Sequence, residues 1–112
     1  MNRHNSIICI SASGYLESDC EIRTDKNGHQ YLRFKMICTS TTPAGATVEI
    51  PFRCFTYNMK YSHLRQGALV FVMGEFKYSR HNDKINFDIY VNQITHGGYN
   101  GPNNFVKSAS PG

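Results

Sequence analysis

Residues 19–36 read DCEIRTDKNGHQYLRFKM, and the second half of this stretch shows the pattern that decides the fold. The pair Asn27-Gly28 is a strong signal for a tight turn between two strands. After this turn, in HQYLRFKMICTS at 29–40, apolar and polar side chains alternate with a period of two. Such alternation predicts a β-strand with one buried face and one face toward solvent.

The same period of two recurs along most of the chain. It predicts strands over 6–17, 29–40, 48–55, 68–79 and 85–95, with a connection at 18–28, a loop at 41–47 and a hairpin tip at 80–84. Residues 56–67 predict a short helix, which Thr56 or Asn58 can cap and Gly67 can end. Five short strands with one helix between the third and the fourth is the order of an OB-fold, an all-β, five-stranded Greek-key barrel.

Length and composition indicate one domain followed by a tail. We expect an OB-fold domain over 1–96 and a flexible tail rich in Gly, Asn, Ser and Pro over 97–112. Within the domain, Gly14 predicts a bulge or sharp bend in the first strand, and Pro51 predicts that part of the third strand lies at an edge or an irregularity.

The charge balance favours an anionic partner. The formal net charge is +4, the isoelectric point is about 9.0, and Tyr and Phe number seven each. The cysteines show no spacing typical of a metal site, and no cofactor motif is present, so Cys9, Cys38 and Cys54 are expected to be small core residues. Free core thiols suit a reducing compartment, and no apolar run is long enough for a signal peptide or a membrane span, so we expect a cytoplasmic protein.

The alternation also predicts which side chains share a face. The inward sets are Leu32, Phe34, Met36 and Cys38 on one strand and Val48, Ile50, Phe52 and Cys54 on the next. The outward sets are Tyr31, Arg33, Lys35 and Ile37, and Glu49, Pro51, Arg53 and Phe55. If these two strands pair, Tyr31, Arg33, Lys35, Arg53 and Phe55 form one surface.

Such a surface mixes aromatic rings with cations. Each of these residues alone is ordinary on a solvated strand face. Together they favour single-stranded nucleic acid, because cations neutralise phosphates while aromatic rings stack on bases. The predicted hairpin tip adds Lys77, Tyr78, Arg80, His81 and Lys84, although a plain solvated turn would also explain those residues.

The sequence also resembles the bacterial single-stranded DNA-binding protein family. The stretch SGYLESDCEIRTDKNG carries the resemblance through Gly14, Asp19, Glu21, Ile22, Arg23, Asn27 and Gly28, and LRQGALVFVMGEFKY supports it. The likeness covers about residues 5–95. It implies an OB-fold that binds single-stranded DNA without sequence preference in replication, recombination or repair, usually as a homotetramer and sometimes as a dimer. It also implies that Phe55 is the stacking aromatic at the end of the third strand and that Arg53 is the arginine of that strand.

The chain departs from the family pattern at three places. Two tryptophans common in the family fall on Glu49 and His81, which predicts weaker binding or a shorter footprint. The acidic tip through which family members recruit replication and repair enzymes is absent from the ending NNFVKSASPG. A specialised member without that tip fits these departures, so any protein partners would bind elsewhere.

Other readings remain open on the sequence alone. A primosomal replication protein of the same fold also lacks the acidic tip. An OB-fold module for protein–protein interaction would place the outward aromatics against a partner, and Tyr15 or Tyr90 could serve there. An enzyme is not expected, because the chain shows no nucleophile elbow, phosphate-binding loop or metal-ligand spacing.

Overall fold

Residues 6–99 are the part of the chain that the computed structural model describes. They form six strands and one short 3-10 helix: β1 (Ile8–Leu16), β2 (Glu21–Thr24), β3 (Gln30–Thr41), β4 (Thr47–Thr56), η1 (Met59–Tyr61), β5 (Ala68–His81) and β6 (Lys84–Tyr99). β6 continues past the expected domain boundary at residue 96 as far as Tyr99. The rest of the expected tail, from residue 100, lies outside the described residues.

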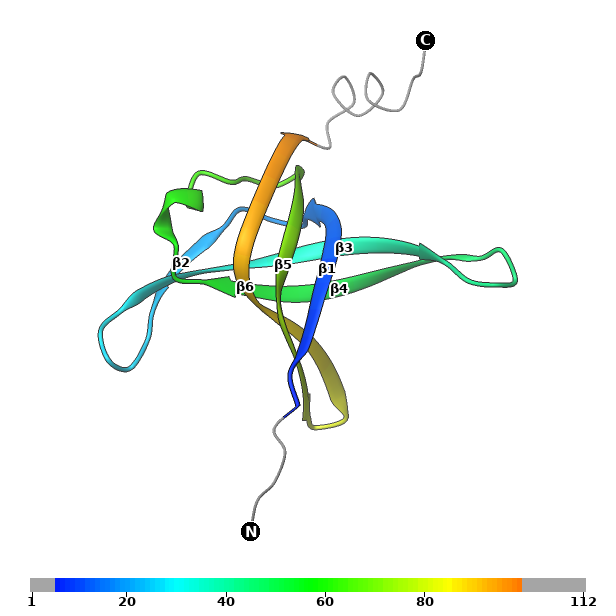
Figure 1. The fold of residues 1–112 in the computed structure, drawn as a ribbon, viewed down its shortest axis with the longest axis horizontal. Helices are drawn as coiled ribbons and strands as arrows, with labels where there is room; N and C mark the ends of the chain where they lie inside the picture. Colours follow the sequence, from blue (N-terminus) through cyan, green and yellow to red (C-terminus); the bar gives the residue numbers. More distant parts are fainter. Residues whose placement is uncertain (1–5, 100–112) are drawn as a thin grey trace.

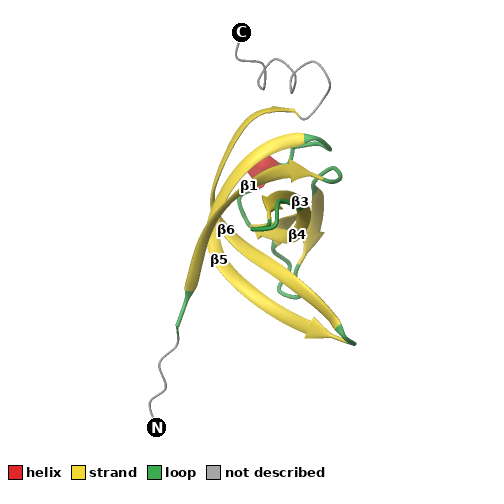
Figure 2. Cartoon of the chain, turned by 90° about the vertical axis from the view of Figure 1, so that its right-hand side faces the viewer, coloured by secondary structure: helices red, strands yellow, loops and turns green. Residues whose placement is uncertain are grey.

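The strands form one sheet that closes on itself. Their order is β1-β5-β6-β4-β3-β2, and a further pairing between β1 and β3 completes the barrel. β4 and β6 run parallel, and every other pairing in this sheet is antiparallel. β1, β5 and β6 cross the long β3–β4 hairpin, and the β5–β6 hairpin projects from the barrel (Figures 1 and 2). This is the OB-fold that the sequence predicts.

Gly14 closes the barrel through a close backbone contact. A Cβ atom at this position would overlap the carbonyl oxygen of Ile37, because β1 meets β3 immediately beyond it, at Tyr15. Of the bulge or sharp bend predicted at Gly14, the bulge is absent, since β1 pairs with β5 in an unbroken register through this residue. Irregularities do occur in the pairing of β5 with β6, between Ala68 and Val70 and between Met73 and Gly74.

The expected helix over 56–67 is limited to the three residues of η1. The backbone that follows makes hydrogen bonds to β1 and its connection instead of continuing a helix. The Cys20 amide donates to the carbonyl of Leu64 at 3.1 Å, and the Gly67 amide donates to the carbonyl of Leu16 at 2.9 Å. These contacts hold the segment as a cover over the end of the barrel.

The expected connection over 18–28 contains an additional strand. β2 pairs with β3 from Glu21 opposite Arg33 to Thr24 opposite Gln30, so it widens the sheet beyond the closed barrel. The predicted turn at Asn27-Gly28 is present, and Gly28 has a positive φ of 88°. Such a backbone conformation favours glycine.

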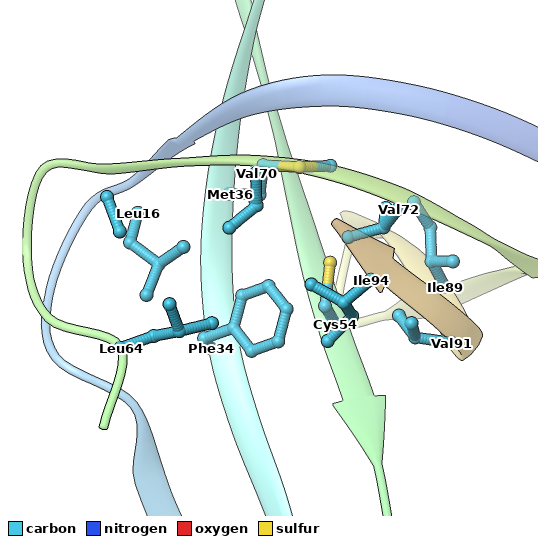
Figure 3. Packing of buried hydrophobic residues seen from close by; sticks show 11 residues of the cluster. Leu16, Phe34, Met36, Cys54, Leu64, Val70, Val72, Ile89, Val91 and Ile94 are labelled. Carbon is cyan, nitrogen blue, oxygen red and sulfur yellow. The ribbon is translucent and has the colours of Figure 1, made fainter. Parts of the chain in front are cut away.

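The core lies inside the barrel. It consists mainly of Leu16, Phe34, Met36, Cys54, Leu64, Val70, Val72 and Ile89, with Phe34 between Leu64 and Cys54 (Figure 3). Leu32 is also fully buried, so the inward half of the prediction is confirmed for three of the four side chains on β3 and for Cys54 on β4. Ile50 and Phe52 are half-buried.

Four expectations about burial are wrong or incomplete. Val48 is exposed because the outer half of the β3–β4 hairpin extends past the barrel (Figure 1). Ile37, expected outside, is buried where β1 joins β3. Cys38 is half-buried, and Cys9 is exposed rather than part of the core. Barrel closure and strand length, which local alternation does not encode, account for these differences.

Pro51 occupies the position that its missing amide allows. It lies opposite Ile37 of β3, and the parallel pairing of β4 with β6 begins two residues later at Arg53. One side of β4 is therefore unpaired at the proline, which confirms the expected edge position. Over residues 6–99, no helix has the length and apolar character needed to cross a bilayer.

Candidate nucleic-acid interface

The pairing of β3 with β4 brings the predicted aromatic and cationic residues onto one face. Arg33 lies opposite Phe55, and Lys35 lies opposite Arg53. Directly opposed residues in an antiparallel pair point to the same side of the sheet. Tyr31 follows on the same side of β3, and its ring centroid is 6.3 Å from that of Phe55.

The parallel pairing of β4 with β6 adds Tyr90 and Asp88 to this face. Phe55 lies opposite Tyr90, and Arg53 lies opposite Asp88. Tyr90 is 49% exposed, and its ring meets Phe55 edge-on at a centroid distance of 5.4 Å. On the sequence alone, Tyr90 is only a candidate contact to a protein partner. Its neighbour on β4 could not be inferred, because no local signal reveals a parallel pairing between distant segments.

Four rings form a continuous aromatic row, in the order Tyr57, Tyr31, Phe55 and Tyr90. Tyr57 and Tyr31 have a centroid separation of 5.8 Å, which is within the usual range for interacting rings. These rings and Asp25 line a surface hollow of about 250 Å³. Phe55 and Tyr31 are half-buried, whereas Tyr57 is 64% exposed. Exposed rings of this kind leave faces on which bases can stack.

Sequence reasoning missed Tyr57, although its spacing held a signal. It comes two residues after Phe55, so a longer strand would place both rings on the same side. β4 does extend to Thr56, one residue further than expected. The Tyr57 hydroxyl donates to Asp25 Oδ2 at 2.9 Å, and this bond raises the pKa of Tyr57 above its ordinary value.

Arg53 is held by a two-bond ion pair with Asp88. Its Nε and Nη2 atoms donate to the two carboxylate oxygens at 2.7 and 2.8 Å. These hydrogen bonds raise the pKa of Arg53 above its ordinary value. The guanidinium also lies over the Phe55 ring, 5.7 Å from its centroid. Two of its five N–H donors are engaged by Asp88, so three remain for another acceptor.

A second hollow, of about 160 Å³, joins this face to the β5–β6 hairpin. Its cationic lining residues are Arg33, Lys35, Arg53 and Lys84, and we call it the cationic groove. It places Lys84, from the start of β6, beside the cations of β3 and β4. The groove and the aromatic row share the β3–β4 face, because Arg33 lies opposite Phe55.

The predicted cations differ in their ion pairs. Lys35 lies 3.3 Å from Glu17, and Lys77 lies 3.0 Å from Glu75. These pairs are partly exposed and therefore weak, so a phosphate can compete for either lysine. Within residues 6–99, Arg33, Arg80 and Lys84 have no ion-pair partner and carry uncompensated charge.

The β5–β6 hairpin divides the other predicted residues between two faces. Lys77 lies opposite Asp88, and His81 lies opposite Lys84, so alternation directs these side chains to the face that carries Arg53. Tyr78 and Arg80 occupy the intervening positions and point the other way. Tyr78 accordingly contacts Phe87, at a centroid distance of 6.4 Å, and not the aromatic row.

Glu49 lies outside the cationic groove. It is opposite Thr39 near the outer end of the β3–β4 hairpin, and its carboxylate accepts a hydrogen bond from the Tyr15 hydroxyl at 3.4 Å. The nearby negative charge of Glu49 raises the pKa of Tyr15. Among the described residues, no three His, Cys, Asp or Glu side chains are grouped so that they could hold a metal ion.

Comparisons with known proteins place this geometry among solved structures. No protein-family model matches the sequence, and no curated protein matches it. The small single-stranded DNA-binding protein of Streptomyces coelicolor superposes with a TM-score of 0.68 and 22% identity over 84% of this chain and 96% of that one. This chain has the same fold.

Two more solved structures agree. The mitochondrial single-stranded DNA-binding protein of S. cerevisiae gives a TM-score of 0.61 at 18% identity, covering 85% of this chain and 99% of that one. The Plasmodium falciparum protein, solved in complex with single-stranded DNA, gives 0.63 at 17%, covering 86% and 98%. The OB-fold prediction is thereby confirmed over nearly the full length of each of the three neighbours.

Proposed function

We propose that this chain binds single-stranded DNA, largely without sequence preference, and that it is not an enzyme. The observation that carries the proposal is the joining of the aromatic row and the cationic groove on one face of the barrel. The three solved neighbours, all of them single-stranded DNA-binding proteins by name, support it.

In the proposed complex the two parts of the face have different tasks. Arg33, Lys35 and Lys84 neutralise successive phosphates along the cationic groove, with Arg53 donating one of its free N–H groups. Phe55, Tyr31 and Tyr90 offer ring faces to bases, and each stacked base contributes about 1–3 kcal/mol. Lys77 and His81 extend the cationic face along the β5–β6 hairpin, whereas Tyr78 and Arg80 would meet a strand that wraps around it.

Titration of a fluorescent oligo-dT with the full chain at several salt concentrations tests this proposal. The logarithm of the binding constant should fall linearly with the logarithm of salt, with a slope of about −0.7 for each phosphate contacted. Tyrosine emission should also be quenched if the rings stack on bases. Absence of binding at low salt would overturn the proposal. A binding constant that does not change with salt concentration would favour an apolar interface instead.

We also propose that the chain self-associates. Phe71 and Met73 on the outer side of β5 are 43% and 41% exposed, and Phe71, Thr95 and Ser13 contribute to a shallow hollow of about 390 Å³. Exposed apolar surface of this kind is typical of interfaces. Light scattering of the free chain should give the mass of a dimer or a tetramer, and a monomer at every concentration would refute self-association.

The cellular role that we propose is protection of single strands exposed in replication, recombination or repair, in the cytoplasm. The aromatic row has the ring exposure that such binding needs, and the net charge of +4 suits a polyanionic partner.

A further inference from the structure

One end of the aromatic row carries a carboxylate, which phosphate binding and base stacking do not explain. Asp25 lines the same hollow as the four rings, at the side of Tyr57. A negative charge close to a bound polyanion is unfavourable unless the carboxylate makes hydrogen bonds to the ligand. Asp25 is therefore the residue of this hollow that should discriminate between ligands by their hydrogen-bond donors.

The carboxylate is fixed in place by the turn that it supports. Asp25 Oδ1 accepts hydrogen bonds from the backbone amides of Asn27 and His29, each at 2.9 Å. Oδ2 accepts the Tyr57 hydroxyl at 2.9 Å, while His29 Nδ1, at 3.8 Å, lies beyond hydrogen-bonding distance of Oδ2. The His29 amide bond is the main reason that the pKa of Asp25 is below its ordinary value, so the group is ionised near neutral pH.

The Asp25 carboxylate and the Tyr57 hydroxyl then present only hydrogen-bond acceptors to a ligand. An ionised carboxylate offers about four lone-pair sites, and the three bonds above leave one on Oδ2. Because the Tyr57 hydroxyl donates its proton to Asp25, its oxygen also presents a lone pair. Oδ2 of Asp25 and the hydroxyl oxygen of Tyr57 therefore form two adjacent acceptors at the edge of a stacking surface.

We propose that Asp25 and Tyr57 form a subsite that selects guanine within an otherwise sequence-tolerant groove. This inference rests on the proposed binding of single-stranded DNA. Guanine presents two adjacent donors, N1–H and N2–H₂, on its Watson–Crick edge, and bases of unpaired strands are read on that edge. Adenine and cytosine pair one donor with an acceptor, which would face the carboxylate. Thymine has one N–H between two carbonyl groups.

The test compares short oligo-dT strands that carry one central dT, dG, dA, dC or deoxyinosine, each titrated with the full chain by fluorescence anisotropy. The dG strand should bind about tenfold more tightly than the all-dT strand, which is within the range for a two-bond base contact. Deoxyinosine keeps N1–H and lacks the N2 amino group, so it should fall between dG and dT.

Two variants locate the preference. Asp25→Asn keeps an oxygen for the turn amides and replaces the free acceptor with an NH₂ donor, so the ratio of dG to dT affinity should fall to about one. Loss of the negative charge should raise the affinity for both strands alike, so this ratio is the readout. Asp83→Asn, at the tip of the β5–β6 hairpin, removes the same charge far along the chain from the row and should keep the preference.

The outcomes separate the two proposals. If oligo-dT binds with salt dependence but the central dG gives no gain, the guanine subsite is wrong and the proposed function stands. If Asp25→Asn keeps the full dG preference, the selectivity arises elsewhere and the subsite is again wrong. If no strand binds at low salt, both proposals fail.

Discussion

Arg53 of β4 donates two hydrogen bonds to Asp88 of β6, at 2.7 and 2.8 Å, across the parallel junction of the two strands. The Asp88 residue is only 5% exposed, whereas the Arg53 side chain is 31% exposed. The arginine therefore compensates a buried carboxylate as well as facing the groove. Its position on the candidate site and its contribution to the barrel cannot be separated.

Replacing Arg53 with Ala should destabilise the fold more than replacing any other cation of the groove. Removing one partner of a buried ion pair costs about 3–5 kcal/mol, and the partial exposure of Arg53 lowers our expectation to about 2–3 kcal/mol. Urea unfolding followed by circular dichroism measures the loss. Arg33→Ala, on the same face without an ion pair, is the control and should change stability by less than about 0.5 kcal/mol. Equal effects of the two variants would contradict the structural importance of the pair.

Phe55→Ala should weaken binding of oligo-dT by about tenfold, because it removes one of the two central rings of the aromatic row. The loss of one stacked base corresponds to about 1–3 kcal/mol. Fluorescence anisotropy gives the affinity, and a thermal melt shows whether the variant is folded at the assay temperature. Val48→Ala, an exposed apolar position on the other face of β4, is the matched control. Wild-type affinity in a folded Phe55→Ala protein would refute the stacking role.

Alternation along one strand was enough to predict about half of the residues that share this face. Tyr31, Arg33 and Lys35 could be placed outward from β3 alone, and Phe55 and Arg53 joined them once β3 and β4 paired in sequence order. Local pattern and a hairpin connection encode that much of the face.

The remainder depends on contacts between distant segments. Tyr90 reaches the row through the parallel β4–β6 pairing, and Ile37 is buried by the crossing of β1 over β3. The sequence pattern around these residues does not predict either contact. The expected helix failed for a similar reason, since the backbone amide of Cys20, more than forty residues earlier, bonds to Leu64 in the segment predicted as helical.

Arg33→Ala should lower the salt dependence of binding by about 0.7 in the log–log slope, equivalent to one phosphate contact on a single strand. Arg33 lines the cationic groove and has no ion-pair partner within residues 6–99, so its full charge is available. The measurement is the oligo-dT titration at four or more salt concentrations. Lys60→Ala removes a cation whose ammonium lies over Tyr61, on η1, and should leave the slope unchanged. A wild-type slope in Arg33→Ala would remove this residue from the phosphate path.

The four cysteines should differ sharply in reactivity toward an alkylating reagent at pH 8. Cys9 is exposed, whereas burial raises the pKa of Cys20 to about 11 and raises that of Cys38 and Cys54. The thiolate is the reactive form, and a raised pKa keeps these three groups protonated until the pH approaches the higher value. Mass spectrometry of the native chain should show one rapid modification, which Cys9→Ser abolishes. Rapid modification of Cys54 in the folded protein would contradict its burial.

Gly14→Ala should destabilise the barrel by about 1–3 kcal/mol, the usual cost of forcing an additional methyl group into a packed site. Its Cβ would overlap the carbonyl oxygen of Ile37, a backbone atom that cannot move without opening the β1–β3 closure. Urea unfolding measures the effect, with Gly97→Ala as the control, because nothing lies within 4 Å of a Cβ at that position on β6. Since β1 carries no residue of the cationic groove or the aromatic row, oligo-dT affinity at low temperature should change little in Gly14→Ala. If Gly14→Ala and Gly97→Ala were equally stable, there would be room for a Cβ atom between Gly14 and the Ile37 carbonyl, and the close contact of β1 with β3 would be wrong.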